Sequence, residues 1–308
     1  MGPPARSRSA ITVPGPLDLG LLAVAVLAVS TSAPIIAATT APALAIAFWR
    51  CFLGAGATSL WVVWRRRGEV ATLTRRQIRG TALAGVLLAA HFGTWIPSLR
   101  FTSVASATAL VATQPVWAAL LARWRGAQVA PAAWVGIAIS LLGVVVLTGI
   151  DFSLDPRSAI GNGLALAGAI LAAAYVSATE DVRAGLSTGT TTLLTYGFAA
   201  LALLPVCLVL RVPMVGFSQR DWILIIALTV LAQLLGHSLI AWVLATTSAT
   251  VTSLAILFEL PGAVIIAAVW LGVVPPLSIL PALALLFIGL IVVIRSADLP
   301  ELVEDPAG

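Results

Sequence analysis

Four side chains that could carry charge or exchange protons stand inside long apolar stretches of the sequence: Arg50, His91, His237 and Glu259. A charge at the centre of a membrane-crossing helix costs roughly 2.5–3.5 kcal/mol, so such a residue needs a partner or a wet cavity. Glu259 stands two positions before Pro261, which has no N–H to donate to the preceding helical turn. Each of these residues is therefore a candidate for a site within the membrane, and Glu259 is the candidate for proton coupling.

Each candidate also has a structural alternative. Glu259 could be a neutral carboxyl that hydrogen-bonds between helices. Arg50 could contact an anionic group such as a substrate carboxylate, or it could extend towards the outer interface or cap a helix end. The two histidines could join helices by ordinary hydrogen bonds, as Ser, Thr, Gln and His do in membrane bundles.

The composition indicates which elements surround these residues. Hydrophobic residues make up 60% of the 308 and charged residues only 9%, with a mean hydropathy of +1.07. A soluble globular domain carries about 25% charged residues, so a soluble enzyme and a disordered protein are excluded. A nucleic-acid binder is excluded as well. All 17 basic residues are arginines, most of them lie in short clusters between apolar runs, and no basic patch is interleaved with aromatic residues.

A helix needs about 20 largely apolar residues to cross a bilayer. The sequence contains ten such runs, so we predict an all-α integral membrane protein with ten transmembrane helices. The runs are Leu17–Ala38, Leu44–Trp64, Arg79–Leu99, Ser103–Trp124, Pro131–Gly149, Gly161–Glu180, Thr188–Leu210, Trp222–Val243, Thr247–Leu271 and Leu277–Ile294.

The distribution of arginines predicts the orientation, because cytoplasmic loops carry an excess of basic residues. With the N-terminus inside, most arginines fall on the cytoplasmic side and few on the external side, so both termini are expected in the cytoplasm. The cytoplasmic set is Arg6, Arg8, Arg65, Arg66, Arg67, Arg75, Arg76, Arg79, Arg123, Arg125, Arg183 and Arg295. The external set is Arg100, Arg157, Arg211 and Arg220.

The sequence also contains an internal repeat. The only two histidines are 146 positions apart, and other landmarks coincide at the same offset. The pairs are His91 with His237, Pro115 with Pro261, Trp124 with Trp270, Gly126 with Gly272, and Gly143 with Gly289. Because five predicted helices separate equivalent positions, equivalent helices should cross the membrane in opposite directions, as in the inverted repeats of many transporters. We therefore predict a cytoplasmic tail (1–16), two inverted five-helix repeats (17–149 and 161–295), an external linker (150–160) and an acidic cytoplasmic tail (296–308).

This 5+5 layout resembles the EamA-type transporters of the drug/metabolite transporter superfamily. The resemblance is carried by Ala41-Pro42, Phe48-Trp49-Arg50, the small residues of 103–113 before Pro115, and the segments 161–175 and 250–261. It implies a ten-helix exporter of amino acids or related metabolites. Many members carry a glutamate just after the glycines that end helices 4 and 9, where this chain has Ala127 and Val273.

Helical spacing brings several polar and aromatic side chains together. His91 shares a helix face with Trp95, and Gln233 shares one with His237, because residues four apart are neighbours on a helix. We expect these faces, with others from the fourth, sixth and ninth predicted helices, to line a central cavity. The expected substrate-binding residues are His91, Trp95, Thr113, Trp117, Tyr175, Gln233, His237 and Glu259.

We therefore expect a secondary transporter of small organic solutes in a bacterial inner or plasma membrane. Its partners would be a small-molecule substrate and the lipid bilayer. Transport could be coupled to protons, which would then be a further partner, or it could be facilitated exchange. The motif GxxxxGK[ST] is absent, so ATP is not the expected energy source, and no cofactor, metal or nucleic acid is expected. A nucleotide-sugar or sugar-phosphate carrier is the alternative within transport, although the chain has no lysine and one intramembrane arginine. A membrane bundle with no transport function is the alternative outside transport. An intramembrane enzyme would need a nucleophile–base pair or an HExxH motif, and the sequence has neither.

Overall fold

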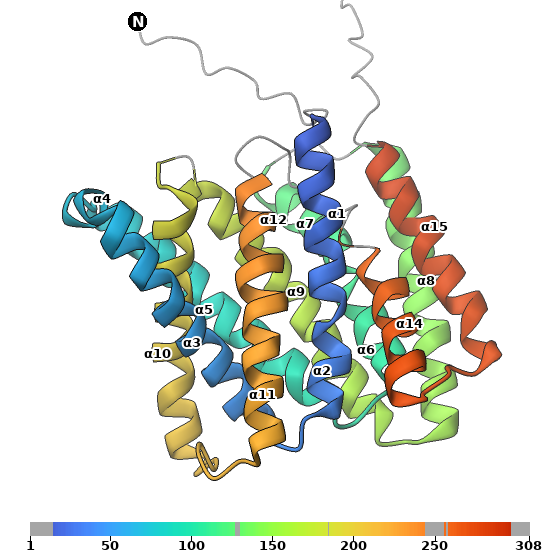
Figure 1. Cartoon of the computed structure of the whole chain (residues 1–308). Coiled ribbons are helices and arrows are strands. Elements are labelled where there is room, and N and C mark those ends of the chain that lie inside the picture. Colours follow the sequence, from blue (N-terminus) through green and yellow to red (C-terminus); the bar gives the residue numbers. More distant parts are fainter. Residues whose placement is uncertain (1–14, 127–129, 184, 244–255, 257, 297–308) are drawn as a thin grey trace, which may run out of the picture.

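The structure is a computed structural model, and it describes residues 15–126, 130–183, 185–243, 256 and 258–296. Every regular element among these residues is a helix (Figure 1), which confirms the all-α class for this part of the chain. The helices are α1 (Pro16–Ser30), α2 (Ser32–Ala38), α3 (Ala43–Arg65), α4 (Arg67–Ala71), α5 (Arg75–Ser98), α6 (Val104–Val111), α7 (Gln114–Trp124), α8 (Pro131–Leu154), α9 (Ser158–Arg183), α10 (Thr188–Val209), α11 (Gln219–Leu228), the π-helix η1 (Thr229–His237), α12 (Ser238–Val243), α14 (Glu259–Leu271), the 3₁₀-helix η2 (Leu277–Ile279) and α15 (Leu280–Ser296).

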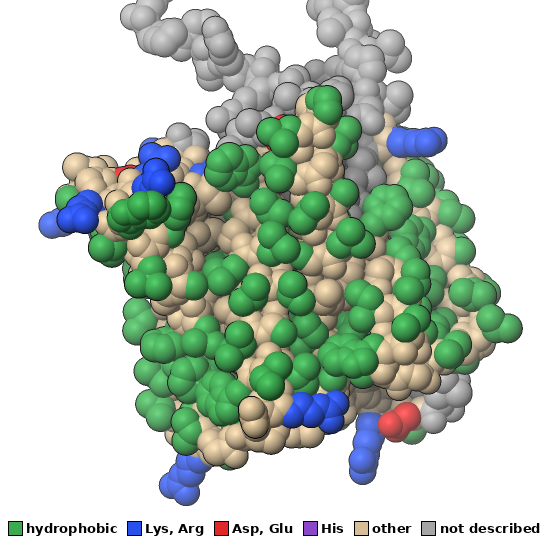
Figure 2. Space-filling view, viewed as in Figure 1, with side chains coloured by type: hydrophobic (Ala, Val, Ile, Leu, Met, Phe, Trp, Pro, Cys, Tyr) green, Lys and Arg blue, Asp and Glu red, His purple; other side chains and the backbone are tan. Residues whose placement is uncertain are grey.

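Seven helical segments are long and apolar enough to cross a membrane. They are Pro16–Ala38, Ala43–Arg65, Arg75–Ser98, Val104–Trp124, Ser158–Arg183, Thr188–Val209 and Gln219–Val243. Three shorter apolar helices accompany them in the described part of the chain, at Pro131–Val146, Glu259–Leu271 and Leu277–Gly289. On the face shown in Figure 2, arginine side chains gather at the two ends, and the band between them carries hydrophobic side chains. Such a surface is that of a membrane protein.

Two of the long segments are broken near their middle. The first changes from α1 to α2 at Thr31, whose hydroxyl donates to the carbonyl of Ala28 at 2.7 Å. The fourth changes from α6 to α7 at Ala112–Thr113, just before Pro115. Proline removes one helical hydrogen bond and clashes with the carbonyl four residues earlier, so Pro115 accounts for the second break.

The eighth predicted helix is wound differently in its middle third. Residues Thr229–His237 form a π-helix between α11 and α12. This rare conformation occurs frequently at functional sites, and here it holds Gln233 and His237.

Residues related by the 146-residue offset make reciprocal contacts where α8 packs against α15. A Cβ atom added to Gly143 would lie 2.9 Å from the backbone nitrogen of Leu286, and one added to Gly289 would lie 2.5 Å from that of Ser140. Ser140 and Leu286 are themselves 146 positions apart. The two glycines therefore let the backbones approach closely, each at the other's equivalent position.

The direction of the chain also differs between equivalent helices. In Figure 1, α5 runs away from the end of the bundle where α4 lies, whereas the segment from α11 to α12 runs towards that end.

Gly126 and Gly272, which follow α7 and end α14, both adopt left-handed backbone angles, with φ of 92° and 68°. A side chain with a Cβ would be strained in this conformation.

Two carboxylates fasten connections between helices. Glu69, after α3, accepts hydrogen bonds from the backbone N–H of Ser187 at 2.6 Å and the hydroxyl of Thr190 at 2.7 Å. Asp221, in the first turn of α11, accepts from the backbone N–H and the hydroxyl of Thr40, both at 2.7 Å. Each carboxylate therefore joins a residue of one half of the chain to a connection in the other half.

Candidate functional site

A cavity lies among α1, α2, α5, α6, α7, α9, η1, α12 and α14. It contains about 760 Å³ of space free of protein atoms, a figure that includes its opening. Its described lining residues are Val29, Ser32, His91, Trp95, Val111, Gln114, Ala172, Tyr175, Val176, Thr179, His237, Ile240, Ala241, Ile256 and Glu259. Apolar and polar side chains both contribute to this wall, as in many ligand pockets.

Five of the eight expected substrate-binding residues line this cavity: His91, Trp95, Tyr175, His237 and Glu259. They come from α5, α9, η1 and α14, so both halves of the chain contribute to one wall. The structure thus brings the two histidines, whose equivalence is visible only through the repeat, to the same space.

The hydrogen bond of His91 fixes the polarity of its ring. The Nδ1 atom lies 2.9 Å from the carbonyl oxygen of Gly168 on α9. Because a carbonyl only accepts, Nδ1 must carry the hydrogen, and Nε2 of the neutral ring is then an acceptor. The ring stacks on Trp95, with ring centroids 5.9 Å apart and planes 5° from parallel.

Glu259 is the first residue of α14 and the only acidic residue among the described lining residues. Its position follows Phe258, at the start of the helix that contains Pro261 in its first turn. A carboxylate is favoured near a helix N-terminus by the unpaired N–H groups there. No hydrogen bond or ion pair joins its carboxylate to any residue that the structure describes.

Arg50 and Gln233 lie behind this wall rather than in it. Both side chains are 0% exposed, and Nε of Arg50 donates to Oε1 of Gln233 at 2.7 Å. The guanidinium carbon lies 3.9 Å from the centre of the Phe92 ring, and Phe92 in turn contacts His237 edge-on at 6.0 Å. The outward extension expected as an alternative for Arg50 is therefore absent, and Gln233 is turned towards α3.

Thr113 and Trp117 also lie outside the main lining. The indole N–H of Trp117 donates to the hydroxyl of Thr113 at 3.0 Å, which uses both polar groups within one helix. Thr113 instead borders a second, smaller cavity of about 250 Å³, with Ser140 and Leu260 among its walls. Both residues stand at or after the break at Ala112–Thr113.

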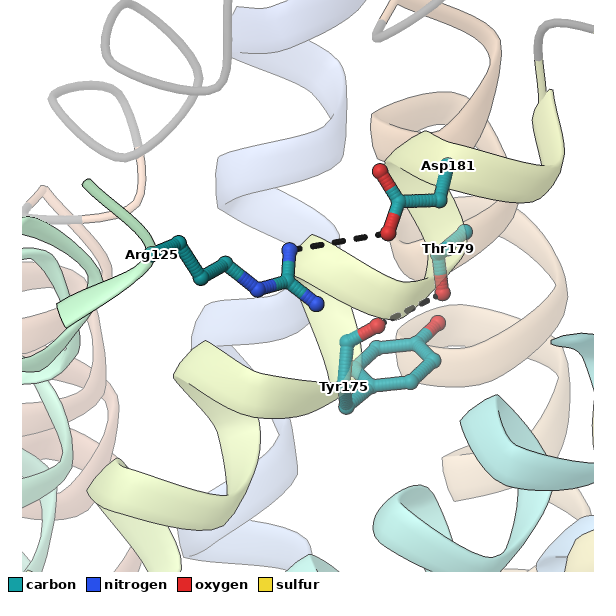
Figure 3. A network of polar contacts seen from close by, with 4 residues as sticks. All are labelled: Arg125, Tyr175, Thr179 and Asp181. Atoms are coloured by element: carbon teal, nitrogen blue, oxygen red, sulfur yellow. Dashed lines mark hydrogen bonds and ion pairs between the residues drawn. The ribbon is translucent and has the colours of Figure 1, made fainter. Parts of the chain in front are cut away.

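Sequence reasoning did not select Gln114 and Thr179, which line the cavity. Gln114 begins α7 at the break before Pro115. Thr179 is four residues after Tyr175 on α9, and this spacing could have identified it. Its hydroxyl donates to the backbone carbonyl of Tyr175 at 2.8 Å (Figure 3).

An ion pair stands beside this part of α9. Nη1 of Arg125, after α7, lies 3.5 Å from Oδ2 of Asp181, with side chains 50% and 66% exposed (Figure 3). Exposed pairs of this kind contribute about 0–1 kcal/mol. The pair nevertheless joins the end of the fourth predicted helix to the sixth, two residues beyond Thr179.

Among the residues that the structure describes, no group of three or more His, Cys, Asp and Glu side chains could hold a metal ion. Residues 244–255 and 257 lie outside the described part, and those from 247 onward belong to the ninth predicted helix. In the sequence these positions carry no ionisable side chain.

Two segments of the chain, residues 17–149 and 159–295, match the model of the EamA-like transporter family. No curated protein matches the chain. Among solved structures, one entitled "Crystal structure of protein" is 20% identical, with a TM-score of 0.64. The match covers 90% of this chain and 96% of the other, so the two share a fold.

Proposed function

Because the chain belongs to the EamA-like transporter family, we propose that it is a secondary transporter that moves small organic solutes across a membrane by alternating access. Amino acids and related metabolites or drugs are the proposed solutes, and export is the proposed direction. The proposed setting is a bacterial inner or plasma membrane, with ten crossing helices and both termini in the cytoplasm.

The observation that carries this proposal is the shared cavity. His91 from the first matched segment and His237 from the second border the same space, and they occupy equivalent positions of the repeat. Transporters with inverted repeats bind their substrates between the repeats, often beside broken helices. The breaks at Thr31 and Ala112–Thr113, close to lining residues Ser32 and Gln114, support this interpretation.

Glu259 is the proposed proton-coupling residue. It is the one described lining residue whose charge could change by release of a carboxyl proton, and it has no fixed partner among the described residues. Intramembrane acids with this setting are typical of proton relays.

The absence of Lys and Arg from the described lining favours amino acids over nucleotide sugars or sugar phosphates. The latter solutes carry several negative charges, which need basic partners in an apolar cavity. The single intramembrane arginine, Arg50, is buried behind Phe92.

The test is solute flux in proteoliposomes that contain the full chain. A panel of amino acids and drugs is compared with and without a pH gradient, for the unmodified protein and for Glu259→Gln. We expect gradient-driven flux in the former and its loss in the latter. Glu180→Gln is the matched control, because Glu180 is exposed at the end of α9. Absence of flux for every solute contradicts the transport proposal, whereas gradient-driven flux in Glu259→Gln contradicts only proton coupling through this residue.

A further inference from the structure

We propose that the cavity recognises its solute through a cationic amine, held by Glu259 and His91, with an apolar body beside Trp95. This inference rests on the proposed transport function and narrows the solutes to one chemical class. It also means that a carboxylate on the solute is not required for binding.

The first argument is charge. Glu259 is the only acidic residue of the described lining, and Lys and Arg are absent from it. Residues 244–255 and 257 add no ionisable side chain, because the sequence has none there. An ionised carboxylate in an apolar cavity is costly unless it is paired. No described residue forms a hydrogen bond or ion pair with Glu259, and the buried Arg50 guanidinium acts on it electrostatically without direct contact. A solute ammonium group would supply a positive charge and N–H donors in direct contact with this carboxylate.

The second argument is the direction of the available hydrogen bonds. His91 donates from Nδ1 to Gly168, which leaves Nε2 as an acceptor without a partner among the described residues. The hydroxyl of Thr179 donates to the carbonyl of Tyr175, so towards the cavity it offers only lone pairs. Nε2 of His91 and the hydroxyl of Thr179 are therefore acceptors towards the cavity, and an ammonium has three donors to offer. The indole N–H of Trp95 is the donor of fixed polarity in the described lining, and it has no hydrogen-bond partner among the described residues.

The third argument is the shape of the wall around these groups. Trp95 stacks on His91 through its ring face and is buried, and Val111, Val176 and Ile240 continue the apolar surface. An aromatic or branched aliphatic body attached to the amine would pack against this apolar surface.

A solute carboxylate has no Lys or Arg partner in the described lining. The guanidinium of Arg50, fully buried, faces the ring of Phe92 and Gln233 rather than bordering the cavity. The zwitterionic form of an amino acid would therefore bring a negative charge that no Lys or Arg of the described lining neutralises. An amide or a decarboxylated amine with the same side chain avoids this cost.

The test uses the full chain purified in detergent and the equilibrium binding of radiolabelled phenylalaninamide. The competitors are phenethylamine, phenylalanine and 3-phenylpropionate, which share one aromatic body. We expect the two amines without a carboxylate to bind at least as tightly as phenylalanine. Phenylpropionate should bind about tenfold more weakly or worse, because its carboxylate would meet the like charge of Glu259.

Two variants test whether Glu259 and His91 bind the amine. Glu259→Gln should weaken phenylalaninamide binding about tenfold or more, since an unpaired ammonium would remain in the cavity, and Glu180→Gln should leave it unchanged. His91→Phe keeps an aromatic ring and removes the acceptor. It should weaken binding of phenethylamine and spare phenethyltrimethylammonium, which has no N–H to donate.

Tight binding of phenylpropionate, a tenfold preference for phenylalanine over its amide, or unchanged binding in Glu259→Gln would each overturn the proposal. Should Glu259→Gln fail to fold, the competitor series on the unmodified chain decides. If none of the amines binds while proteoliposomes show flux of another solute, the amine proposal is wrong and the transport proposal stands.

Discussion

Arg50 on α3 and Gln233 in the π-helical segment are joined by a 2.7 Å hydrogen bond at a point where both side chains are fully buried. The remaining guanidinium nitrogens, Nη1 and Nη2, have no hydrogen-bond partner among the described residues. The buried positive charge is in direct contact with the face of Phe92 and the amide oxygen of Gln233, and Glu259 favours it electrostatically without direct contact. This contact also joins the first matched segment of the chain to the second.

Gln233→Leu should lower the free energy of unfolding by about 2–4 kcal/mol, because it leaves the Arg50 guanidinium without its acceptor. Thermal unfolding of the detergent-purified chain measures this loss. Gln219→Leu, at an exposed position on α11, is the control and should have a small effect. The double variant Arg50→Met/Gln233→Leu should regain part of the loss, since no buried charge remains. Equal unfolding temperatures for Gln233→Leu and the unmodified chain would show that the bond contributes nothing.

Gly289→Ala should destabilise the chain by about 1–3 kcal/mol, because the added methyl group overpacks a close helix crossing. Its Cβ would lie 2.5 Å from the carbonyl oxygen of Gly136 and the nitrogen of Ser140, both backbone atoms. Gly163→Ala on α9 is the matched control, since a Cβ there meets nothing within 4 Å. Alanine favours a helix over glycine, so the control should be neutral or slightly stabilising. The reverse ranking in thermal unfolding would contradict the packing of α8 on α15.

The contribution of Glu69 to the stability of the folded chain should depend on pH. Its partial burial acts to raise the pKa of the carboxyl, but hydrogen bonds from Ser187 and Thr190 and the nearby Arg66 outweigh burial, so the pKa lies below its ordinary value. A depressed pKa gives stability that is present above the unfolded value of about 4.3 and is lost as the pH falls through the folded value.

Glu69→Gln should therefore unfold at a lower temperature than the unmodified chain at pH 7, and the difference should shrink below about pH 4. Thermal unfolding over a pH series measures this, with Glu180→Gln as the control at an exposed site. A difference that persists unchanged at pH 3 would show that the ionised carboxylate is not what holds Ser187.

Thr113→Val should leave solute flux close to that of the unmodified chain, although the sequence placed Thr113 among the cavity residues. Its hydroxyl is used by Trp117 and the residue borders the second cavity. Flux in proteoliposomes measures the effect, and His237→Phe, which alters the main cavity, should reduce it. A strong loss of flux in Thr113→Val would mean that the second cavity takes part in transport.

The helical organisation was largely predictable because long apolar runs have few alternatives. The predicted run Leu44–Trp64 corresponds to α3, Ala43–Arg65, and Thr188–Leu210 to α10, Thr188–Val209. Gly143 and Gly289 are one of the residue pairs that revealed the repeat in the sequence, and they also make the reciprocal contacts in the structure. The π-helical turns of Thr229–His237 were not predictable, since no residue type distinguishes them from ordinary helix.

The site was predictable in part. Helical spacing correctly placed His91 beside Trp95, because both lie within the unbroken helix α5. The same spacing placed Trp117 beside Thr113, and the two are hydrogen-bonded, but neither is among the described lining residues of the main cavity. The burial of Arg50 could not be predicted either, since its acceptor, Gln233, is 183 residues away in the sequence.

The crossing of α8 and α15 maps onto itself when the two halves of the chain are interchanged, because Gly143 and Gly289 meet each other's equivalent backbone positions. If inward-facing and outward-facing states differ by such an interchange, this crossing has the same geometry and the same energy in both. It can then remain closed throughout the cycle and act as a fixed pivot about which the other helices tilt.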